Sequence, residues 1–174
     1  SGSRDNYYRA IAIDRPGEAV ELWKLSAEAV SPTLWNNDWD GSGLVIDDYL
    51  FEGGENSQFH MVKLNRGYDA QDLVTLNPDL VFNTPSWDQQ LINDLAGNRA
   101  KEMSIEGSVA ITGNTVYWAN SGGLVMGWDV GPLVAGTGQP QQTFRFWNGD
   151  DTDATIVIDA EGYLYVSAEY ERGN

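Results

Sequence analysis

Short apolar strands separated by polar turns recur along the chain, and three of them share one form. In each, a run of small or β-branched residues leads into a tight polar turn, and an aromatic-rich strand returns. These hairpins cover residues 43–51, 109–118 and 155–166. Hairpins that recur every few dozen residues are typical of radially repeated β folds, most often propellers. The pattern therefore predicts an all-β chain.

We expect residues 1–174 to form part of a single β-propeller domain built from four-stranded antiparallel blades. Blade-like units are predicted at about 7–65, 79–130 and 142–170. Propellers use ~4–8 blades, so three units do not close a ring. The expectation is therefore a partial propeller that is a fragment of a larger one, and the alternative is a disc completed by other chains.

The middle of the chain breaks this rhythm, because the first two hairpins are further apart than the last two. Residues 86–89 read Ser-Trp-Asp-Gln, which resembles a capping box with Ser at the cap and Gln three residues later. Apolar residues then follow at helical spacing. We expect one short rim helix from Trp87 to Leu95, within a helical insertion at about 86–100.

The charge balance excludes some partners. The chain has 26 acidic and 10 basic residues and a formal net charge of −16. Nucleic-acid binding needs a basic surface, and an anionic membrane would repel this chain. No run of about 18 apolar residues occurs, so no membrane insertion is expected. The absence of cysteine excludes disulfides and thiolate metal sites.

The acidic excess has two readings. It indicates solubility or adaptation to a salty or extracellular medium, or carboxylates that hold divalent cations such as calcium. A cysteine-free acidic chain suits an exported protein, so we expect an extracellular, periplasmic or cell-envelope location. The polar start at residues 1–5 resembles a tag remnant or a cut inside a longer polypeptide.

Two loops concentrate carboxylates that could bind calcium. Asp38 and Asp40 lie two positions apart ahead of a glycine, a spacing that calcium loops use, although the glutamate that closes an EF-hand is missing. Asp150, Asp151 and Asp153 place three carboxylates in four positions, where repulsion favours a bound cation or full solvation. The second loop is the better metal candidate, and a solvated turn is the alternative for both.

Three tryptophans, Trp35, Trp39 and Trp87, lie in predicted loops. Exposed loop indoles beside Asp and Asn are typical of glycan-binding surfaces and of protein-interface hot spots. We predict that these rings and Asp88 form a partner-binding site on rim loops, and packing between blades is the alternative. The remaining tryptophans lie in predicted strands and are expected in the core: Trp23, Trp118, Trp128 and Trp147.

The chain also resembles a known repeat. Residues 12–17 with Trp23 resemble the Ala-x-Asp-x-x-x-Gly-x-x-x-Trp docking element of PQQ-like (quinoprotein-type) propeller repeats, although Gly17 comes one residue early and Trp23 late. Residues 108–129 and 158–166 resemble other parts of the repeat. The resemblance implies an eight-bladed propeller, commonly periplasmic or surface-exposed. Family members include quinone-dependent alcohol dehydrogenases and non-catalytic scaffolds of outer-membrane assembly.

The dehydrogenases of that family need a vicinal cysteine pair over the quinone and a Glu, an Asn and an Asp that converge on calcium. This chain has no cysteine, so we expect no bound pyrroloquinoline quinone. It also lacks the Gly-x-Ser-x-Gly element of serine hydrolases. We therefore expect a non-catalytic scaffold that binds a protein or glycan partner through rim loops. The alternatives are a fragment of a PQQ- and calcium-dependent dehydrogenase, and a structural subunit completed by other chains.

Overall fold

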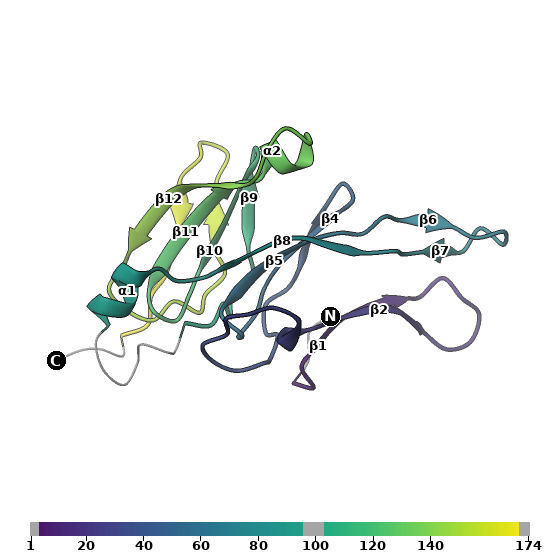
Figure 1. The fold of residues 1–174 in the computed structure, drawn as a ribbon, viewed down its shortest axis with the longest axis horizontal. Helices are drawn as coiled ribbons and strands as arrows, with labels where there is room; N and C mark the ends of the chain where they lie inside the picture. Colours follow the sequence, from purple (N-terminus) through teal and green to yellow (C-terminus); the bar gives the residue numbers. More distant parts are fainter. Residues whose placement is uncertain (1–3, 96–102, 171–174) are drawn as a thin grey trace.

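The computed structural model describes residues 4–95 and 103–170, and the regular secondary structure of this part of the chain consists mainly of short antiparallel strands (Figure 1). The strands are β1 (Tyr7–Ala12), β2 (Val20–Ser26), β3 (Leu44–Ile46), β4 (Tyr49–Gly53), β5 (Gln58–Lys63), β6 (Gly67–Tyr68), β7 (Val74–Thr75), β8 (Asp79–Pro85), β9 (Ala110–Thr112), β10 (Thr115–Ala119), β11 (Leu124–Asp129), β12 (Gln141–Trp147), β13 (Val157–Ile158) and β14 (Leu164–Tyr165). The helices are α1 (Gln89–Asp94), α2 (Gly131–Val134) and a 3-10 turn at Ala27–Ala29.

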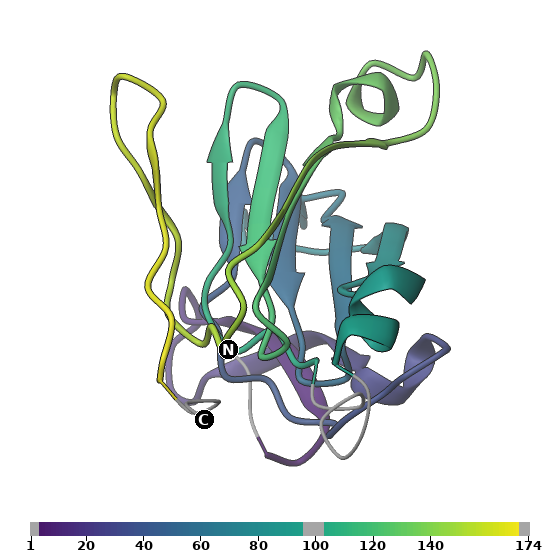
Figure 2. The ribbon, with the colours of Figure 1, turned by 90° about the vertical axis from the view of Figure 1, so that its left-hand side faces the viewer.

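Two four-stranded antiparallel sheets form the centre of the molecule, in the strand orders β3-β4-β5-β8 and β9-β10-β11-β12. Two-stranded sheets, β1-β2 and β13-β14, flank them in the chain, and β6-β7 prolongs the β5–β8 hairpin. Figure 2 shows the β13–β14 hairpin, in yellow, beside the β9–β12 sheet, and β13 contacts β9. We call β3–β4, β9–β10 and β13–β14 the A–B pairs, and β1–β2, β5–β8 and β11–β12 the C–D pairs.

The C–D pairs repeat one backbone geometry. Each has a bulge at the same position of its first strand, after Ala10, Met61 and Gly127. Each also starts with a residue in the left-handed region four positions before the bulge: Asn6, Ser57 and Gly123, with φ of 70, 64 and 81°. The carbonyl oxygen of each left-handed residue accepts a 2.9 Å hydrogen bond from the amide of Ala27, Ser86 or Asn148. The β1–β2 hairpin is therefore the same structural unit as the other two.

Apolar clusters fill the space between successive sheets. In the central cluster the ring of Phe59 stacks on Trp118, with centroids 4.3 Å apart and planes 2° from parallel. Tyr8 belongs to the cluster that joins β1–β2 to the β3–β8 sheet, and Val125 to the cluster that joins the β9–β12 sheet to β13–β14. Tyr8, Phe59 and Val125 each lie two residues before their bulge, so equivalent side chains build every junction.

The predicted fold class, an all-β partial propeller of four-stranded antiparallel blades, is confirmed. The hydrogen-bonded sheets nevertheless divide the chain differently from the predicted blade-like units. The four-stranded sheets extend over Leu44–Pro85 and Ala110–Trp147, whereas the β1–β2 pair at the start of the first predicted unit forms a separate sheet. A repeated hairpin fixes the period of a repeat but does not fix which strand begins each sheet, and this accounts for the shift.

The predicted rim helix is present but shorter. α1 begins after Asp88, whose carboxylate accepts a 2.8 Å hydrogen bond from the Leu91 amide, so Asp88 is the N-cap. Ser86, the predicted cap, instead donates its hydroxyl to the Met103 carbonyl oxygen at 2.6 Å. Positions 96–100 of the predicted insertion lie outside the described residues.

α2 is a second helix where only one is predicted. It is a single turn with a proline in its first turn, and so it carries no apolar periodicity that would mark it in the sequence. Among the described residues, no helix combines the length and the apolar character that crossing a membrane requires.

Candidate functional site: the acidic loop face

The two indoles in the loop before β3 differ in exposure. Trp35 is 51% exposed, whereas Trp39 is 3% exposed. The Trp39 ring packs edge-on against Tyr8, with centroids 5.6 Å apart, and lies 5.0 Å from the His60 ring. The expectation that Trp39 is an exposed loop residue is therefore wrong, because side chains distant in sequence close over it. Trp35 remains available as a contact residue.

The second predicted pair, Trp87 and Asp88, lies at the start of α1. Trp87 is partly buried against the central cluster. Asp88 caps α1 and pairs with Arg145 of β12 at 2.5 Å, and its pKa is lowered chiefly by that hydrogen bond. Both residues therefore have packing or capping contacts within the chain, and their role in partner binding stays a prediction.

Three equivalent loops lead into the A–B pairs and stack on one another. Each contains an acidic, a small and a hydroxyl residue in that order: Asp40-Gly41-Ser42, Glu106-Gly107-Ser108 and Asp153-Ala154-Thr155. The Ser42 amide donates to Ser108 Oγ at 2.9 Å, and the Ser108 amide donates to Thr155 Oγ1 at 3.2 Å. The hydroxyl of the second loop and that of the third loop therefore each accept a hydrogen bond from the backbone of the loop before it.

The small residue of each loop permits this close approach. A Cβ atom at Gly107 would lie 2.6 Å from the carbonyl oxygen of Ala154, and one at Gly41 would lie 3.0 Å from the carbonyl oxygen of Gly107. Approaches below about 3 Å to a backbone atom require the chain to move. Glycine is thus needed at 107, and the same contact recurs with more room at 41.

The stacked loops bring their carboxylates together with Glu55, which lies in the turn after β4. Ser121 Oγ donates to Asp153 Oδ1 at 2.9 Å and lies 3.4 Å from Glu106 Oε1. Burial, with the hydrogen bond and charge of Asp40, raises the pKa of Glu55 to about 7. Burial, with the nearby charges of Asp153 and Asp40, also raises the pKa of Glu106. We call Asp40, Glu55, Glu106 and Asp153 the acidic loop face, and Trp35 is joined to it through the next residue, Asn36, whose side chain hydrogen-bonds Glu55.

The predicted metal ligands are thus divided. Asp40 and Asp153 belong to the acidic loop face, whereas Asp38 lies 3.7 Å from Arg4. Asp150 accepts a 2.9 Å hydrogen bond from the Asp151 amide in a local turn. In the part of the chain that the structure describes, no group of three or more His, Cys, Asp and Glu residues is arranged to hold a metal ion. Calcium binding stays a prediction.

Sequence reasoning missed Glu55 and Glu106. Their neighbours on this face are far away in sequence, and neither residue belongs to an acidic run. For Glu106, the signal that could have found it is the shared order of acidic, small and hydroxyl residues before each A–B pair. No such pattern marks Glu55, because the equivalent residue of the next repeat is Ser121, which is not acidic. The two are equivalent because the Glu55 amide donates to the Asp38 carbonyl oxygen and the Ser121 amide donates to the Ser104 carbonyl oxygen.

A further acid lies below this face, against the core cluster that contains Tyr8 and Trp39. Glu52 is 2% exposed, and burial raises its pKa to about 8. A Cβ atom at Gly43 would lie 2.2 Å from the Tyr8 hydroxyl oxygen and 2.5 Å from Glu52 Oε2, so glycine leaves space for both groups. His60 is fully buried on the neighbouring strand, and burial lowers its pKa to about 4.

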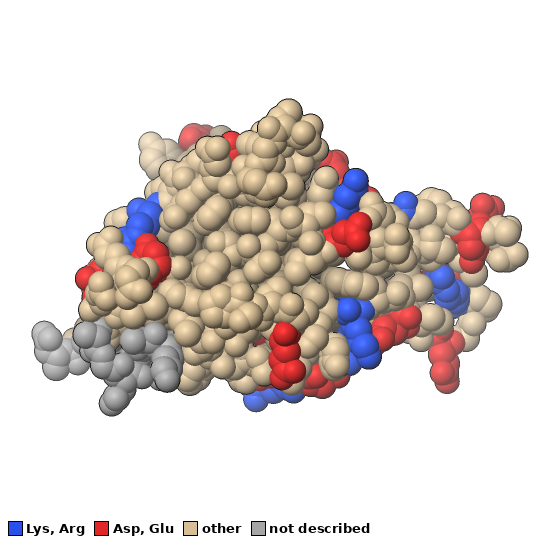
Figure 3. All heavy atoms as spheres, viewed as in Figure 1, with Lys and Arg blue, Asp and Glu red and all other residues tan. Residues whose placement is uncertain are grey.

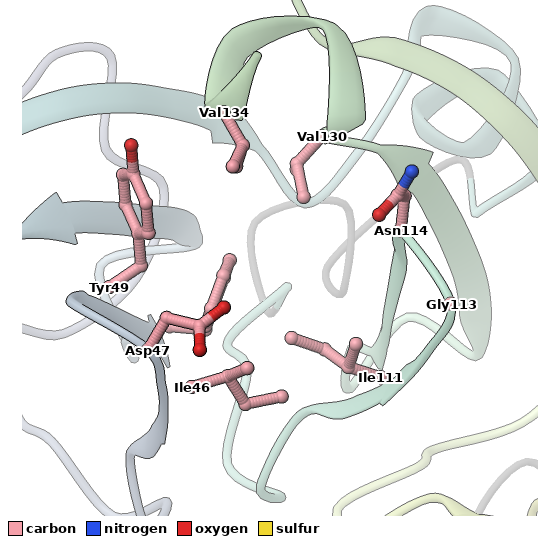
Figure 4. A pocket seen from close by; sticks show the side chains of 9 residues that line it. Ile46, Asp47, Tyr49, Ile111, Gly113, Asn114, Val130 and Val134 are labelled. Atoms are coloured by element: carbon pink, nitrogen blue, oxygen red, sulfur yellow. The ribbon is translucent and has the colours of Figure 1, made fainter.

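A small pocket lies between the two four-stranded sheets, at the ends of β3 and β9 that are remote from the acidic loops (Figure 4). Its volume is about 90 Å³. Ile46 and Ile111 line one side and Val130 and Val134 the other, and the carboxylate of Asp47 points toward the space between them (Figure 4). Pockets for drug-sized molecules measure roughly 300–1,000 Å³, so this one is smaller than such sites.

Strand β12 forms one edge of its sheet and exposes aromatic rings. Phe146 is 55% and Trp147 is 38% exposed. The expectation that Trp147 lies in the core is wrong, because an edge strand lacks a neighbour on one side. Figure 3 shows that the middle of the viewed face carries few charged side chains, and that these lie mainly toward its margins.

Comparisons with known proteins find similarity among solved structures. No protein-family model and no curated protein matches the chain. Among solved structures, BamB from Moraxella catarrhalis is similar, with 15% sequence identity and a TM-score of 0.49. The match covers 84% of this chain and 39% of that one, so this chain spans well under half the length of that protein. The fold assignment rests on the internal repeat described above.

Proposed function

We propose that this chain is part of a non-catalytic β-propeller scaffold, extracellular or in the cell envelope, that binds a protein partner through the acidic loop face. The observation that carries the proposal is the half-exposed indole of Trp35, which precedes Asn36, a residue that hydrogen-bonds one carboxylate of this face. Asn36 connects the two, because its side-chain amide donates to Asp38 at 3.1 Å and hydrogen-bonds Glu55. An aromatic anchor within a polar surface is typical of interface hot spots.

Charge favours a basic partner. The chain carries a net charge of −16, and three half-buried or buried carboxylates of this face lie close enough to perturb one another. A cationic segment would relieve that repulsion, and complementary charge speeds association and sets specificity. Binding should therefore weaken as salt rises, since exposed charges are screened within about 10 Å at 0.1 M ionic strength.

A neutral glycan is the second candidate. Trp35 offers a ring face for stacking, and the neighbouring Asn36 and Asp38 offer hydrogen-bonding groups. Glycan binding would differ from binding of a cationic segment in its weak dependence on salt.

The test uses decalysine and a set of neutral oligosaccharides as probes, with affinity measured by calorimetry at low and moderate salt. We expect decalysine to bind in a salt-dependent way, and Trp35→Ala to weaken binding at least ~10-fold, the size of a modest hot spot. Tyr68→Ala is the control, since it removes a 75% exposed aromatic ring on β6, in the two-stranded sheet that prolongs the β5–β8 hairpin. Absence of binding by every probe, or equal losses in the two variants, would contradict the proposal.

A further inference from the structure

The pocket between the two four-stranded sheets combines an apolar interior with one carboxylate at its mouth. Phe51 and Val130 are 4% and 3% exposed and lie at its buried end, whereas Ile46 and Val134 are 41% and 48% exposed and lie at its opening. Asp47 is also exposed, and its carboxylate points toward the space between the walls (Figure 4). A ligand of this pocket therefore meets hydrocarbon inside and a negative charge at the entrance.

The carboxylate of Asp47 has no partner of its own. Arg66 lies at the same turn, but its guanidinium donates to the carbonyl oxygen of Asp47 and pairs with the carboxylate of Asp48 at 2.9 Å. Within residues 4–95 and 103–170, the side chain of Asp47 makes no hydrogen bond or ion pair. The charge at the mouth of the pocket is thus left for a ligand.

The backbone of the turn does not call for an acidic side chain at this position. Asp47 is the first residue of the two-residue turn between Ile46 and Tyr49, and its φ is 52°. The equivalent residue in the β9–β10 turn is Gly113, with a φ of 56°. Glycine adopts this left-handed region without strain, whereas aspartate does so at some cost. Folding alone therefore favours glycine, and the carboxylate adds a property that the turn does not need.

We propose that this pocket binds a short aliphatic ammonium ion, which enters with its hydrocarbon end first and pairs its charge with Asp47 at the mouth. The pocket volume of about 90 Å³ sets the size of the hydrocarbon. An apolar cavity of about 150 Å³ holds benzene, so this smaller pocket suits a chain of a few carbon atoms instead of a ring.

The order of apolar and charged groups selects among cations. A lysine side chain enters a pocket with its ammonium group first, which would place the charge against Phe51 and Val130 at the buried end. An unpaired charge in apolar surroundings is costly. The ligand therefore carries its ammonium group within one or two bonds of a small aliphatic group. Free alkylamines have this chemistry, and so does the N-terminal residue of a polypeptide when its side chain is aliphatic.

Four probes test the site by NMR of isoleucine methyl groups. Isobutylammonium is the free amine, isobutanol has the same hydrocarbon without the charge, leucinamide represents an N-terminal residue, and Nα-acetyl-lysine methylamide represents a lysine side chain. The methyl signals of Ile46 and Ile111 report on the pocket. The signal of Ile13, which is 88% exposed and follows β1, reports on non-specific effects.

We expect isobutylammonium to shift the Ile46 and Ile111 signals saturably, with a dissociation constant on the order of 1 mM. Isobutanol should bind at least about 3-fold more weakly, the size of an exposed ion pair. Asp47→Gly should abolish this difference, and thermal melts should show it folded because glycine suits the left-handed turn. Asp47→Asn keeps the side-chain size and should give the same loss. Glu161→Gln is the matched control, since it removes one exposed negative charge from the β13–β14 turn.

Three results would overturn the proposal: no saturable shift of Ile46 and Ile111 with isobutylammonium, equal affinity for isobutanol, or an equal loss in Glu161→Gln. Tighter binding of the lysine probe than of isobutylammonium would contradict the orientation of the ligand. Leucinamide that binds at least as tightly as isobutylammonium supports a polypeptide N-terminus as the source, and weaker binding supports a free alkylamine.

This inference is independent of the proposed function, because the pocket lies at the strand ends that are remote from the acidic loops. Trp35→Ala should leave isobutylammonium binding unchanged. Asp47→Gly should leave unchanged the loss of decalysine binding that Trp35→Ala causes. Failure of either proposal can therefore be told apart from failure of the other.

Discussion

The junction between the two four-stranded sheets and the open end at β13–β14 share one repeat but differ in surroundings. Phe51 in β4 and Tyr165 in β14 occupy the same position of the A–B pair, yet they are 4% and 56% exposed. The difference is the next sheet, since Phe51 lies in the central cluster with Val116 and Trp118 of the β9–β12 sheet, and no described sheet follows β13–β14 in the same way. A strand pattern in this fold therefore specifies local structure, and the next repeat decides burial.

The largest predicted effect is the difference in stability lost when Phe51 and when Tyr165 is truncated to alanine. Phe51→Ala removes a ring from the central cluster and should lower the free energy of unfolding by about 3–5 kcal/mol, as such core truncations do. Tyr165→Ala should change it by no more than about 0.5 kcal/mol, since its ring is largely solvated. Urea denaturation of dilute protein measures both values, and similar losses would refute the distinction between a closed and an open end.

The free energy of unfolding should also depend on pH differently for groups near the four-stranded sheets and for groups in the β13–β14 hairpin. Burial raises the pKa of Glu52 from 4.5 to about 8, so the folded chain binds a proton that the unfolded chain has released. Stability from this group is complete below about pH 4.5 and is lost as pH rises toward 8, at about 1.4 kcal/mol per pKa unit. Burial acts in the same direction on Glu55, whose pKa is about 7.

In the β13–β14 hairpin the pKa shift has the opposite sign, so the effect of pH on stability is reversed. The pKa of Asp159 is lowered chiefly by the hydrogen bond from the Tyr165 hydroxyl, so its contribution is present at neutral pH and lost in acid. Chemical denaturation from pH 4.5 to 8 should therefore show falling stability, with a slope whose magnitude Glu52→Gln reduces, Glu55 keeps above zero, and Asp159→Asn leaves in place. Stability that rises over this window in the wild-type chain would show that Glu52 is not held protonated.

A smaller effect should follow the glycines of the stacked loops. Gly107→Ala places a Cβ atom 2.6 Å from the Ala154 carbonyl oxygen and should cost about 1–3 kcal/mol of stability, the range for overpacking. Gly41→Ala is the equivalent change one repeat earlier, where 3.0 Å is available, and should cost less. The equivalent residue at the open end is Ala154, which already carries a Cβ atom. Thermal melts that rank the two variants in the reverse order would contradict the loop stacking.

These contrasts show how far the sequence could predict the fold. The recurring hairpin indicated the all-β repeat, and the helical spacing after Trp87 indicated α1, because both signals are local. The sequence did not show which strand begins each four-stranded sheet, since any of several strands can begin a blade without changing the period of the repeat. The bulge shared by Ala10, Met61 and Gly127 settles the phase, but it has no residue signature.

The candidate site was partly predictable for the same reason. Trp35 and Trp39 lie four residues apart in one polar loop, and only contacts with Tyr8 and His60 make the second a core residue. Asp40 and Asp153 were found as acidic loop residues, but their association with Glu106 depends on loops that stack across the repeat. Local composition marks which residues are polar, and tertiary packing decides which of them meet.

Amide hydrogen exchange of the dilute chain tests the repeat most directly, because it compares equivalent strands in one experiment. The account predicts strong protection throughout β10, which is paired on both edges, and fast exchange of the amides on the free edge of β14. Equal protection of the two strands in monomeric protein, or faster exchange in β10, would contradict the claim that the neighbouring repeat decides burial.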